Sequence, residues 1–135
     1  SYLLLSQDID QEKKEVYEND GRIMQEADTY YFRKRIAEND EHGIYLEFNR
    51  FYGVQTLRVI DAGDNSEIAL DYRLLVKGGK FKVVLLTPEG ELLKVAEQDG
   101  EGTFSVPASE GDYRVKIVGE NADGIIEIHG LLSDN

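Results

Sequence analysis

From Thr29 onward, apolar and polar residues alternate with a period of two, and short segments rich in glycine, asparagine or aspartate interrupt the alternation at regular intervals. Successive side chains of a β-strand point to opposite faces, so each of these runs has one apolar face to bury. Several such runs separated by turn signals are typical of an all-β sandwich or barrel. The sequence therefore predicts an antiparallel β-sandwich, jelly-roll-like or Greek-key-like, over residues 29–135.

The strands follow from the phase of this alternation. Residues 81–86 are apolar on both faces, because Val84 and Leu86 lie on the phase opposite to Phe81. A strand of this kind is typical of the centre of a sheet that is covered on both sides. We expect at least six strands after Gly43. The residues predicted to point into the core are Ile44, Leu46, Phe48, Leu70, Tyr72, Leu74, Phe81, Val83, Leu85, Tyr113, Val115 and Ile117.

Five short segments carry the residue types that tight turns need. Glycine supplies the positive φ of a tight connection, and proline fixes φ at the first corner of a turn. The two prolines, Pro88 and Pro107, fall in a turn and at a strand end, where neither removes a ladder hydrogen bond. The predicted turns are Lys77–Lys80, Pro88–Gly90, Asp99–Gly102, Ser109–Asp112 and Asn121–Gly124.

The segment Tyr30–Ala37 is open to two interpretations. Its apolar residues fit one face of a strand that pairs with residues 44–51. The same residues also fit the beginning of an amphipathic helix capped at Asp28 or Thr29. We favour the strand.

Residues 1–28 differ from the rest of the chain because they carry charge almost continuously. They contain eight acidic and three basic side chains. Large apolar groups over residues 7–20 are confined to Ile9, Val16 and Tyr17, and mixed-charge segments of this kind usually face water. We expect a charged N-terminal arm or short solvated helix at residues 1–28, followed by the sandwich domain at residues 29–135.

Length and composition limit the classes of function. A chain of 135 residues is the size of one domain. Its 27 acidic and 15 basic residues give a net charge of -12, which argues against nucleic acid as a partner. No apolar run approaches the length of a transmembrane helix. The sequence has no cysteine, which excludes disulfides, thiol nucleophiles and cysteine-ligated zinc.

The residues needed for common catalytic sites are scarce. No serine lies in a G-x-S-x-G elbow, and the two histidines, His42 and His129, lie far apart without a metal-binding spacing. Neither a phosphate-binding loop nor a dinucleotide-binding loop follows any predicted strand. Paired carboxylates could cleave a glycosidic bond, but they need a substrate cleft, and the chain has no tryptophan and no long loop to build one. The sequence predicts no cofactor and no enzymatic activity, with a small carboxylate-dependent hydrolase as the alternative.

Calcium requires only oxygen ligands, and two segments offer them. Asp61, Asp64 and Glu67 place three carboxylates within one loop, and Glu120–Asp123 is a poorer cluster. Neither segment matches the spacing of an EF-hand loop, and acidic residues are common in hairpin turns. We therefore predict no metal site, with a Ca²⁺-stabilised structural module as a further alternative.

Aromatic residues crowd around the first predicted hairpin, beside the basic run at residues 33–35 of an otherwise acidic chain. On one continuous strand, alternate residues of this segment would share a face, with one face in the core and the other free to bind. Tyrosine and arginine are enriched at binding interfaces, although pairing with acids on a neighbouring strand would also explain the basic run. The predicted ligand-binding residues are Tyr31, Arg33, Arg35, Tyr45 and Tyr52.

Two strand motifs stand out between Gly78 and Gly130. They are an F-x-V-x-L strand and a later G-x-Y-x-V-x-I-x-G strand, formed by Phe81, Val83 and Leu85 and by Gly111, Tyr113, Val115, Ile117 and Gly119. In these motifs the segment resembles the C-terminal half of small jelly-roll-like domains of exported bacterial proteins, which include pre-peptidase C-terminal domains and uncharacterised lipoprotein domains. The chain departs from the pre-peptidase domains at Lys80 and Lys82, because those domains commonly carry acidic residues just before the central strand.

This resemblance implies export and a noncatalytic, accessory role. We expect an extracellular or cell-envelope binding domain whose partner is a protein or a glycan. A signal peptide, with or without a lipid-attachment cysteine, is expected upstream of Ser1.

Overall fold

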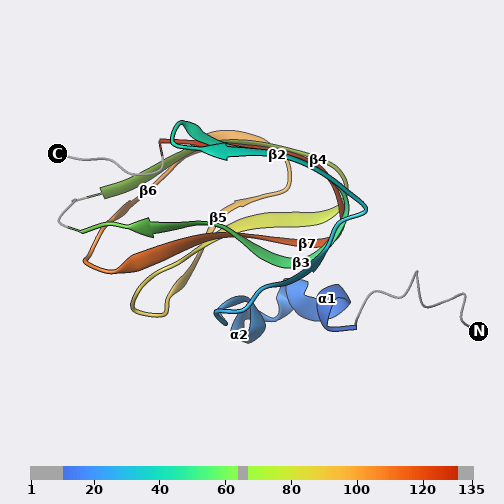
Figure 1. Ribbon diagram of the computed structural model, residues 1–135, viewed down its shortest axis with the longest axis horizontal. Coiled ribbons are helices and arrows are strands. Elements are labelled where there is room, and N and C mark those ends of the chain that lie inside the picture. The colour runs from blue at the N-terminus through green and yellow to red at the C-terminus, as the bar shows by residue number, and fades with distance from the viewer. Residues whose placement is uncertain (1–10, 64–66, 131–135) are drawn as a thin grey trace, which may run out of the picture.

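The computed structural model describes residues 11–63 and 67–130 of the chain. Among these residues, no helix has the length and apolar character needed to cross a membrane. Three short helical segments precede seven strands (Figure 1): α1 (Gln11–Glu15), η2 (Val16–Glu18), α2 (Asp20–Ile23), β1 (Thr29–Tyr31), β2 (Lys34–Asp40), β3 (Gly43–Asp61), β4 (Glu67–Leu86), β5 (Leu92–Glu97), β6 (Gly100–Pro107) and β7 (Asp112–His129).

The strands form an antiparallel β-sandwich, as the alternation predicts, from one hydrogen-bonded sheet that folds over itself. The long strands β3, β4 and β7 each run through both layers, and β7 lies between β3 and β4. This wound connection differs from a simple meander and is jelly-roll-like. The open layer consists of β2, residues 43–49 of β3, 122–129 of β7, 67–76 of β4, and β6. The covered layer consists of β1, residues 51–61 of β3, 112–119 of β7, 80–86 of β4, and β5.

Each long strand bends where it passes from one layer to the other. The register shifts at these points, and a residue with positive φ lies in each bend: Arg50 (φ 50°) in β3, Gly79 (φ 73°) in β4 and Asn121 (φ 52°) in β7. A β-bulge bends its strand and increases the local twist. Bends in three neighbouring strands together fold the sheet into a sandwich.

Two of the five predicted turns are therefore wrong. Lys77–Lys80 and Asn121–Gly124 lie within the continuous strands β4 and β7, where their glycine and asparagine residues form bulges. The other three segments lie at connections between strands, although Gly100–Gly102 already belong to β6. In the β4–β5 turn, Gly90 donates a backbone hydrogen bond to the Thr87 carbonyl at 3.0 Å. Because β4 and β7 each continue through a predicted turn, the described residues from Gly43 onward form five strands, which is fewer than the six or more expected.

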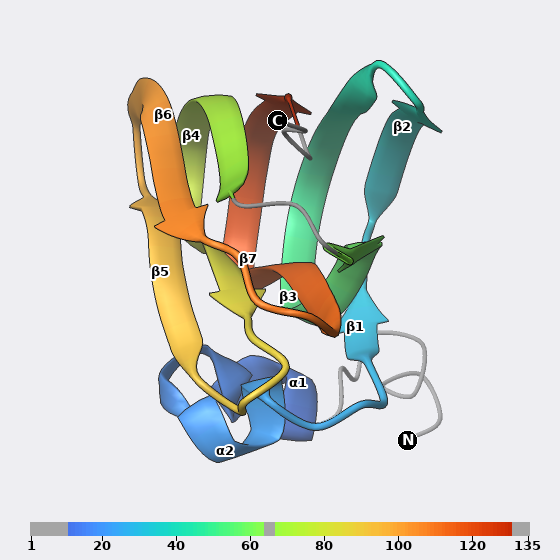
Figure 2. The same cartoon turned by 90° about the vertical axis from the view of Figure 1, so that its left-hand side faces the viewer.

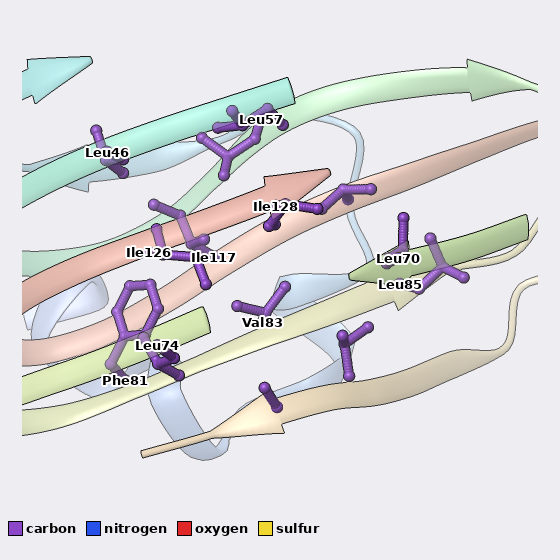
Figure 3. Close-up of a cluster of buried hydrophobic side chains, with 14 of the residues drawn as sticks. Leu46, Leu57, Leu70, Leu74, Phe81, Val83, Leu85, Ile117, Ile126 and Ile128 are labelled. Atoms are coloured by element: carbon purple, nitrogen blue, oxygen red, sulfur yellow. The ribbon is translucent and has the colours of Figure 1, made fainter. Parts of the chain in front are cut away.

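The predicted core is confirmed. Every residue of the predicted inward-facing set is buried except Tyr72, which is half-buried and packs against the core. Figure 3 shows side chains from β3, β4 and β7 meeting between the two layers. Val84 and Leu86 are also buried, as predicted for a central strand covered on both faces.

Residues 30–37 form strands, so the helix interpretation is wrong. The strand is interrupted at Phe32 and Arg33, because β1 pairs with the covered-layer half of β3 and β2 pairs with its open-layer half. The bend of β3 at Arg50 thus imposes a break on its partner. Tyr31 and Arg35 therefore lie on two different strands and not on one continuous face.

The N-terminal helices cover the outer face of the covered layer (Figure 1). Val16, Tyr17 and Ile23 are buried against three valines of the central strands, Val54, Val84 and Val118. The expected short helix is present at residues 11–23, but its apolar residues pack on the sheet instead of facing water. The division of the chain at residue 28 stays a prediction.

Polar contacts also fasten this segment to the sheet. The fully buried Lys116 of β7 donates its Nζ hydrogens to the carbonyl oxygens of Ile23 (2.8 Å) and Gln25 (2.7 Å). Asp28 accepts hydrogen bonds from the backbone and side chain of Thr56, both at 2.9 Å. A position predicted as a helix cap is thus a tether between the N-terminal segment and β3.

Candidate ligand-binding face

The outer face of the open layer is free of the helices that cover the opposite side of the sandwich. Because Ile44, Leu46 and Phe48 point into the core, the residues between them on β3, Tyr45 and Glu47, point outward. No described helix packs on this side (Figure 2). We call it the open face.

Strand register orders the open face into rows across the sheet. One row is largely apolar and runs from Ile36 on β2 through Glu47 and Ile125 to Leu75 on β4. Ile36 and Leu75 are each 45% exposed, so this row presents apolar side chains to solvent at both of its ends. The adjacent row is polar and contains Glu38, Tyr45, Glu127 and Arg73. The face therefore offers an apolar strip beside a charged one.

Three shallow hollows of about 180, 170 and 160 Å³ lie along the open face. Tyr45 borders two of them, with Leu75 and Ile125 in one and His42 and His129 in the other. Each is smaller than the roughly 300–1,000 Å³ pockets that enclose small-molecule ligands. The face is therefore suited to an extended ligand that lies across it, and it does not enclose a substrate.

Tyr45 lies at the centre of the polar row. Its hydroxyl donates a hydrogen bond to Glu47 Oε1 at 3.3 Å. Partial desolvation, together with the nearby carboxylates of Glu47 and Glu127, raises the pKa of Tyr45 above its ordinary value. The phenol thus remains a neutral hydrogen-bonding group at physiological pH. Arg73 and His129 lie 3.9 and 3.7 Å from the Glu127 carboxylate and hold it between two basic groups.

The hollow of about 180 Å³, which Tyr45 does not border, lies at the bend of the central strands between Lys34 and Lys77. Asp123 in its wall accepts hydrogen bonds from the Asn49 side chain and the Arg50 backbone, both at 2.8 Å. This carboxylate therefore stabilises the bulge of β3. The weaker calcium cluster of the sequence, Glu120–Asp123, lies within this bend and not in a loop.

The stronger calcium candidate spans residues that the structure describes only in part. Asp64 lies outside the described residues, and Asp61 accepts a backbone hydrogen bond from Gly63 at 3.1 Å. Within residues 11–63 and 67–130, no three potential metal ligands cluster.

The five predicted ligand-binding residues do not converge on one site. Tyr31 and Tyr52 are cross-strand partners in β1 and β3, and the Arg50 guanidinium lies 5.9 Å from the centre of the Tyr52 ring. Arg35 lies over the ring of Phe32 at 5.5 Å, on the edge of the sandwich. Arg33 is exposed between β1 and β2, and Tyr45 alone lies on the open face.

The crowding of aromatic residues in the sequence mostly reflects packing. Phe32 stacks on Phe51 at 4.5 Å and Phe48 stacks on Phe81 at 4.4 Å, and these rings close the core beside β1. Leu75 and Ile125 are on the open face but were not among the predicted binding residues. The sequence could have pointed to them, because each is an apolar residue at a position of its strand where the alternation otherwise places polar side chains.

No family model matches the chain, and no curated protein matches it in sequence. Among solved structures, a mutant of the family 29 carbohydrate binding module CBM29-2 aligns with a TM-score of 0.42 and 14% identity over 78% of this chain and 72% of that one. A mutant of the same module in complex with mannohexaose aligns with a TM-score of 0.40 and 13% identity, covering 78% and 77% of the two chains. The enzymatically active domain of bacteriophage CBA120 tailspike protein 4 aligns with a TM-score of 0.40 and 10% identity over 89% of this chain and 21% of that one.

Proposed function

We propose that this chain is a noncatalytic binding module that holds an extended glycan across its open face. The observation that carries the proposal is the asymmetry of the sandwich. One outer face is covered by the N-terminal helices, while the other exposes Tyr45, Leu75 and Ile125 among charged side chains. Exposed apolar groups framed by polar ones are typical of a binding surface.

The chemistry of the face supports a glycan more than a protein segment. Each sugar hydroxyl can donate and accept hydrogen bonds, so it suits carboxylates, cations and amides that alternate at short intervals. Glu127 and Arg73 offer such groups in one hollow, and Glu47 offers another in a second hollow of the same face. Sugar rings also have apolar C–H faces, for which Tyr45 and Leu75 provide a small platform. A protein interface would need a larger apolar centre than these shallow hollows supply.

We further propose that the module acts outside the cell or on the cell envelope. A chain without cysteine folds in the same way in reducing and oxidising compartments, which is compatible with export.

Binding to soluble polysaccharides tests the proposal. Affinity electrophoresis on a panel of neutral and charged polysaccharides would find the ligand class, and calorimetry with its oligosaccharides would measure Kd. We expect the substitution Tyr45→Ala to weaken binding by about tenfold or more, as removal of a central contact does. The variant should keep the far-UV circular dichroism of the wild type, because Tyr45 is outside the core.

Tyr52→Ala is the matched control, because it removes the same side chain from the β1 side of the molecule. It should leave Kd unchanged. If Tyr52→Ala abolished binding and Tyr45→Ala did not, the ligand would bind beside β1, and the open face would be the wrong site. If no polysaccharide were retained, the glycan proposal itself would be refuted.

A further inference from the structure

Strand β2 forms an edge of the open layer, and every one of its residues is exposed. In the described part of the chain it pairs with β3 alone (Figure 2). An unpaired edge strand presents backbone donors and acceptors that can hydrogen-bond to another strand. Natural proteins usually protect such an edge, for example with a proline, a bulge or charged side chains, which repel most incoming strands.

The charges of β2 are separated by sign along the strand. The basic residues Arg33, Lys34 and Arg35 lie at its beginning, and the acidic residues Glu38, Asp40 and Glu41 lie at its end. No ion pair joins Arg33 or Lys34 to another described residue. A strand with one basic end and one acidic end is complementary to a second copy of itself in the antiparallel direction.

We propose that two copies of this chain pair edge to edge through β2, in antiparallel orientation around a two-fold axis at Ala37. In this register Lys34 of each copy is opposite Asp40 of the other. Arg33 and Glu41, one residue beyond the ends of the strand, are also opposite each other. Directly opposed residues of antiparallel strands have Cβ atoms about 5 Å apart, within reach of ion pairing. A two-fold axis repeats each of these pairs, so one strand supplies both halves of its own interface.

The same charges disfavour other partners. A strand that pairs in parallel, or an unrelated acidic or basic strand, would bring like charges together. The two-fold axis lies perpendicular to the sheet, so the open layers of the two copies join into one continuous layer. Their open faces then point to the same side. This pairing is independent of which ligand the face binds.

A pair of charge variants tests the proposal. The first, Arg33→Glu with Lys34→Glu, makes both ends of the strand acidic. The second, Glu38→Lys with Asp40→Asn and Glu41→Lys, makes both ends basic or neutral. Asparagine is chosen at residue 40 because the Asp40 Oδ1 accepts the backbone hydrogens of His42 (2.9 Å) and Gly43 (3.3 Å), and an amide oxygen can keep that turn.

Sedimentation equilibrium at low ionic strength measures the mass of the wild type, of each variant and of their mixture. We expect the wild type to sediment at twice its 15.3 kDa monomer mass. Each variant alone should have a dimer Kd weaker by about tenfold or more, because attraction at every pair becomes repulsion or is lost. The equimolar mixture should form a heterodimer, because each strand then faces its complement. Added salt should weaken the wild-type dimer.

Three results would overturn the proposal. The first is a wild type that stays monomeric at about 100 μM, a concentration at which a dimer with a micromolar Kd is almost completely formed. The second is a variant that dimerises as the wild type does, which would place the interface elsewhere. The third is a mixture that stays monomeric although both variants keep the circular dichroism and melting temperature of the wild type. Retained folding in that measurement separates lost pairing from lost structure.

Discussion

Replacing Lys116 by methionine tests how the N-terminal helices are fastened to the sheet. The methionine keeps most of the aliphatic stem and removes the ammonium group, which donates to the carbonyl oxygens of Ile23 and Gln25. Hydrogen bonds from a charged donor contribute roughly 1.5–3 kcal/mol each, and loss of the donor leaves a carbonyl of the buried Ile23 unpaired. Relief from burying a charge offsets part of this loss. We expect the free energy of unfolding to fall by about 1–3 kcal/mol.

Urea denaturation followed by circular dichroism measures this change, and the melting temperature should fall by roughly 3–10 °C for a domain of this size. The damage should be greatest near the lost contacts, so amide hydrogen exchange should accelerate in α2 before it does in β7. Lys77→Met is the control, because Lys77 is exposed and borders the hollow at the bend of the central strands. If Lys116→Met kept the stability within about 0.5 kcal/mol, Lys116 would not hold the helices, and apolar packing alone would do so.

The pH dependence gives an independent check on the same residue. Burial lowers the pKa of Lys116 below its ordinary value of 10.5, against the opposing attraction of Asp28. The unfolded chain then binds more protons than the folded one as the pH approaches 10.5 from below. Stability contributed at this position must therefore rise with pH in that window. The difference between wild type and Lys116→Met should grow accordingly, and a difference that shrank would show that Asp28 outweighs burial.

Three further changes have defined outcomes. Gly79→Ala should lower the free energy of unfolding by about 2 kcal/mol or more, because φ is 73° and the new Cβ would lie 2.0 Å from a backbone oxygen. Gly90→Ala is its control and should cost only about 1 kcal/mol, because φ is 90° but the space around it is open. Thermal melts of the two variants compare these costs. Tyr17→Phe should lower the free energy of unfolding by about 1 kcal/mol in urea denaturation, because the Tyr17 hydroxyl donates a hydrogen bond to Glu97 Oε2 at 2.7 Å. Burial raises the pKa of Tyr17, so an absorbance titration should show that this phenol stays protonated until the protein unfolds. Val83→Ala should cost on the order of 1–3 kcal/mol in the same denaturation assay, and a cost below about 0.5 kcal/mol would contradict its place in the core.

Burial was predictable from the sequence because it depends on a period that each strand carries locally. Ile44, Leu46 and Phe48 alternate with Tyr45 and Glu47, so only one face of that strand can point into the core. The bends were not predictable in the same way. Lys77–Lys80 has the composition of a hairpin turn, and a glycine with positive φ serves a bulge as well as a turn. Only the partner strand decides between them, and β7 pairs with β4 on both sides of Gly79.

The candidate binding face was harder to predict than the core. Tyr45 could be proposed because tyrosine is common at interfaces, but its neighbours on the face come from strands far away in sequence. Leu75 and Ile125 join it only because β7 returns to lie between β3 and β4. Tyr31 and Tyr52 are cross-strand neighbours, whereas Arg35 lies on the separate strand β2, so the three residues do not form one surface. The break between β1 and β2 follows the bend of their partner β3, which local sequence does not reveal.

The bent strands also explain how one sheet can carry two different outer faces. Each long strand contributes to the open face with one half and to the helix-covered face with the other, as Tyr45 and Val54 do on β3. The two halves are separated by a bulge whose backbone is held by local contacts, such as those of Asp123 to Asn49 and Arg50. Packing under the helices can therefore be weakened without moving the side chains of the open face. Loss of the Lys116 contacts should therefore lower the free energy of unfolding and leave ligand affinity unchanged below the melting temperature. Removal of the Asp123 carboxylate should lower both stability and ligand affinity, because this group borders a hollow and also holds the bend.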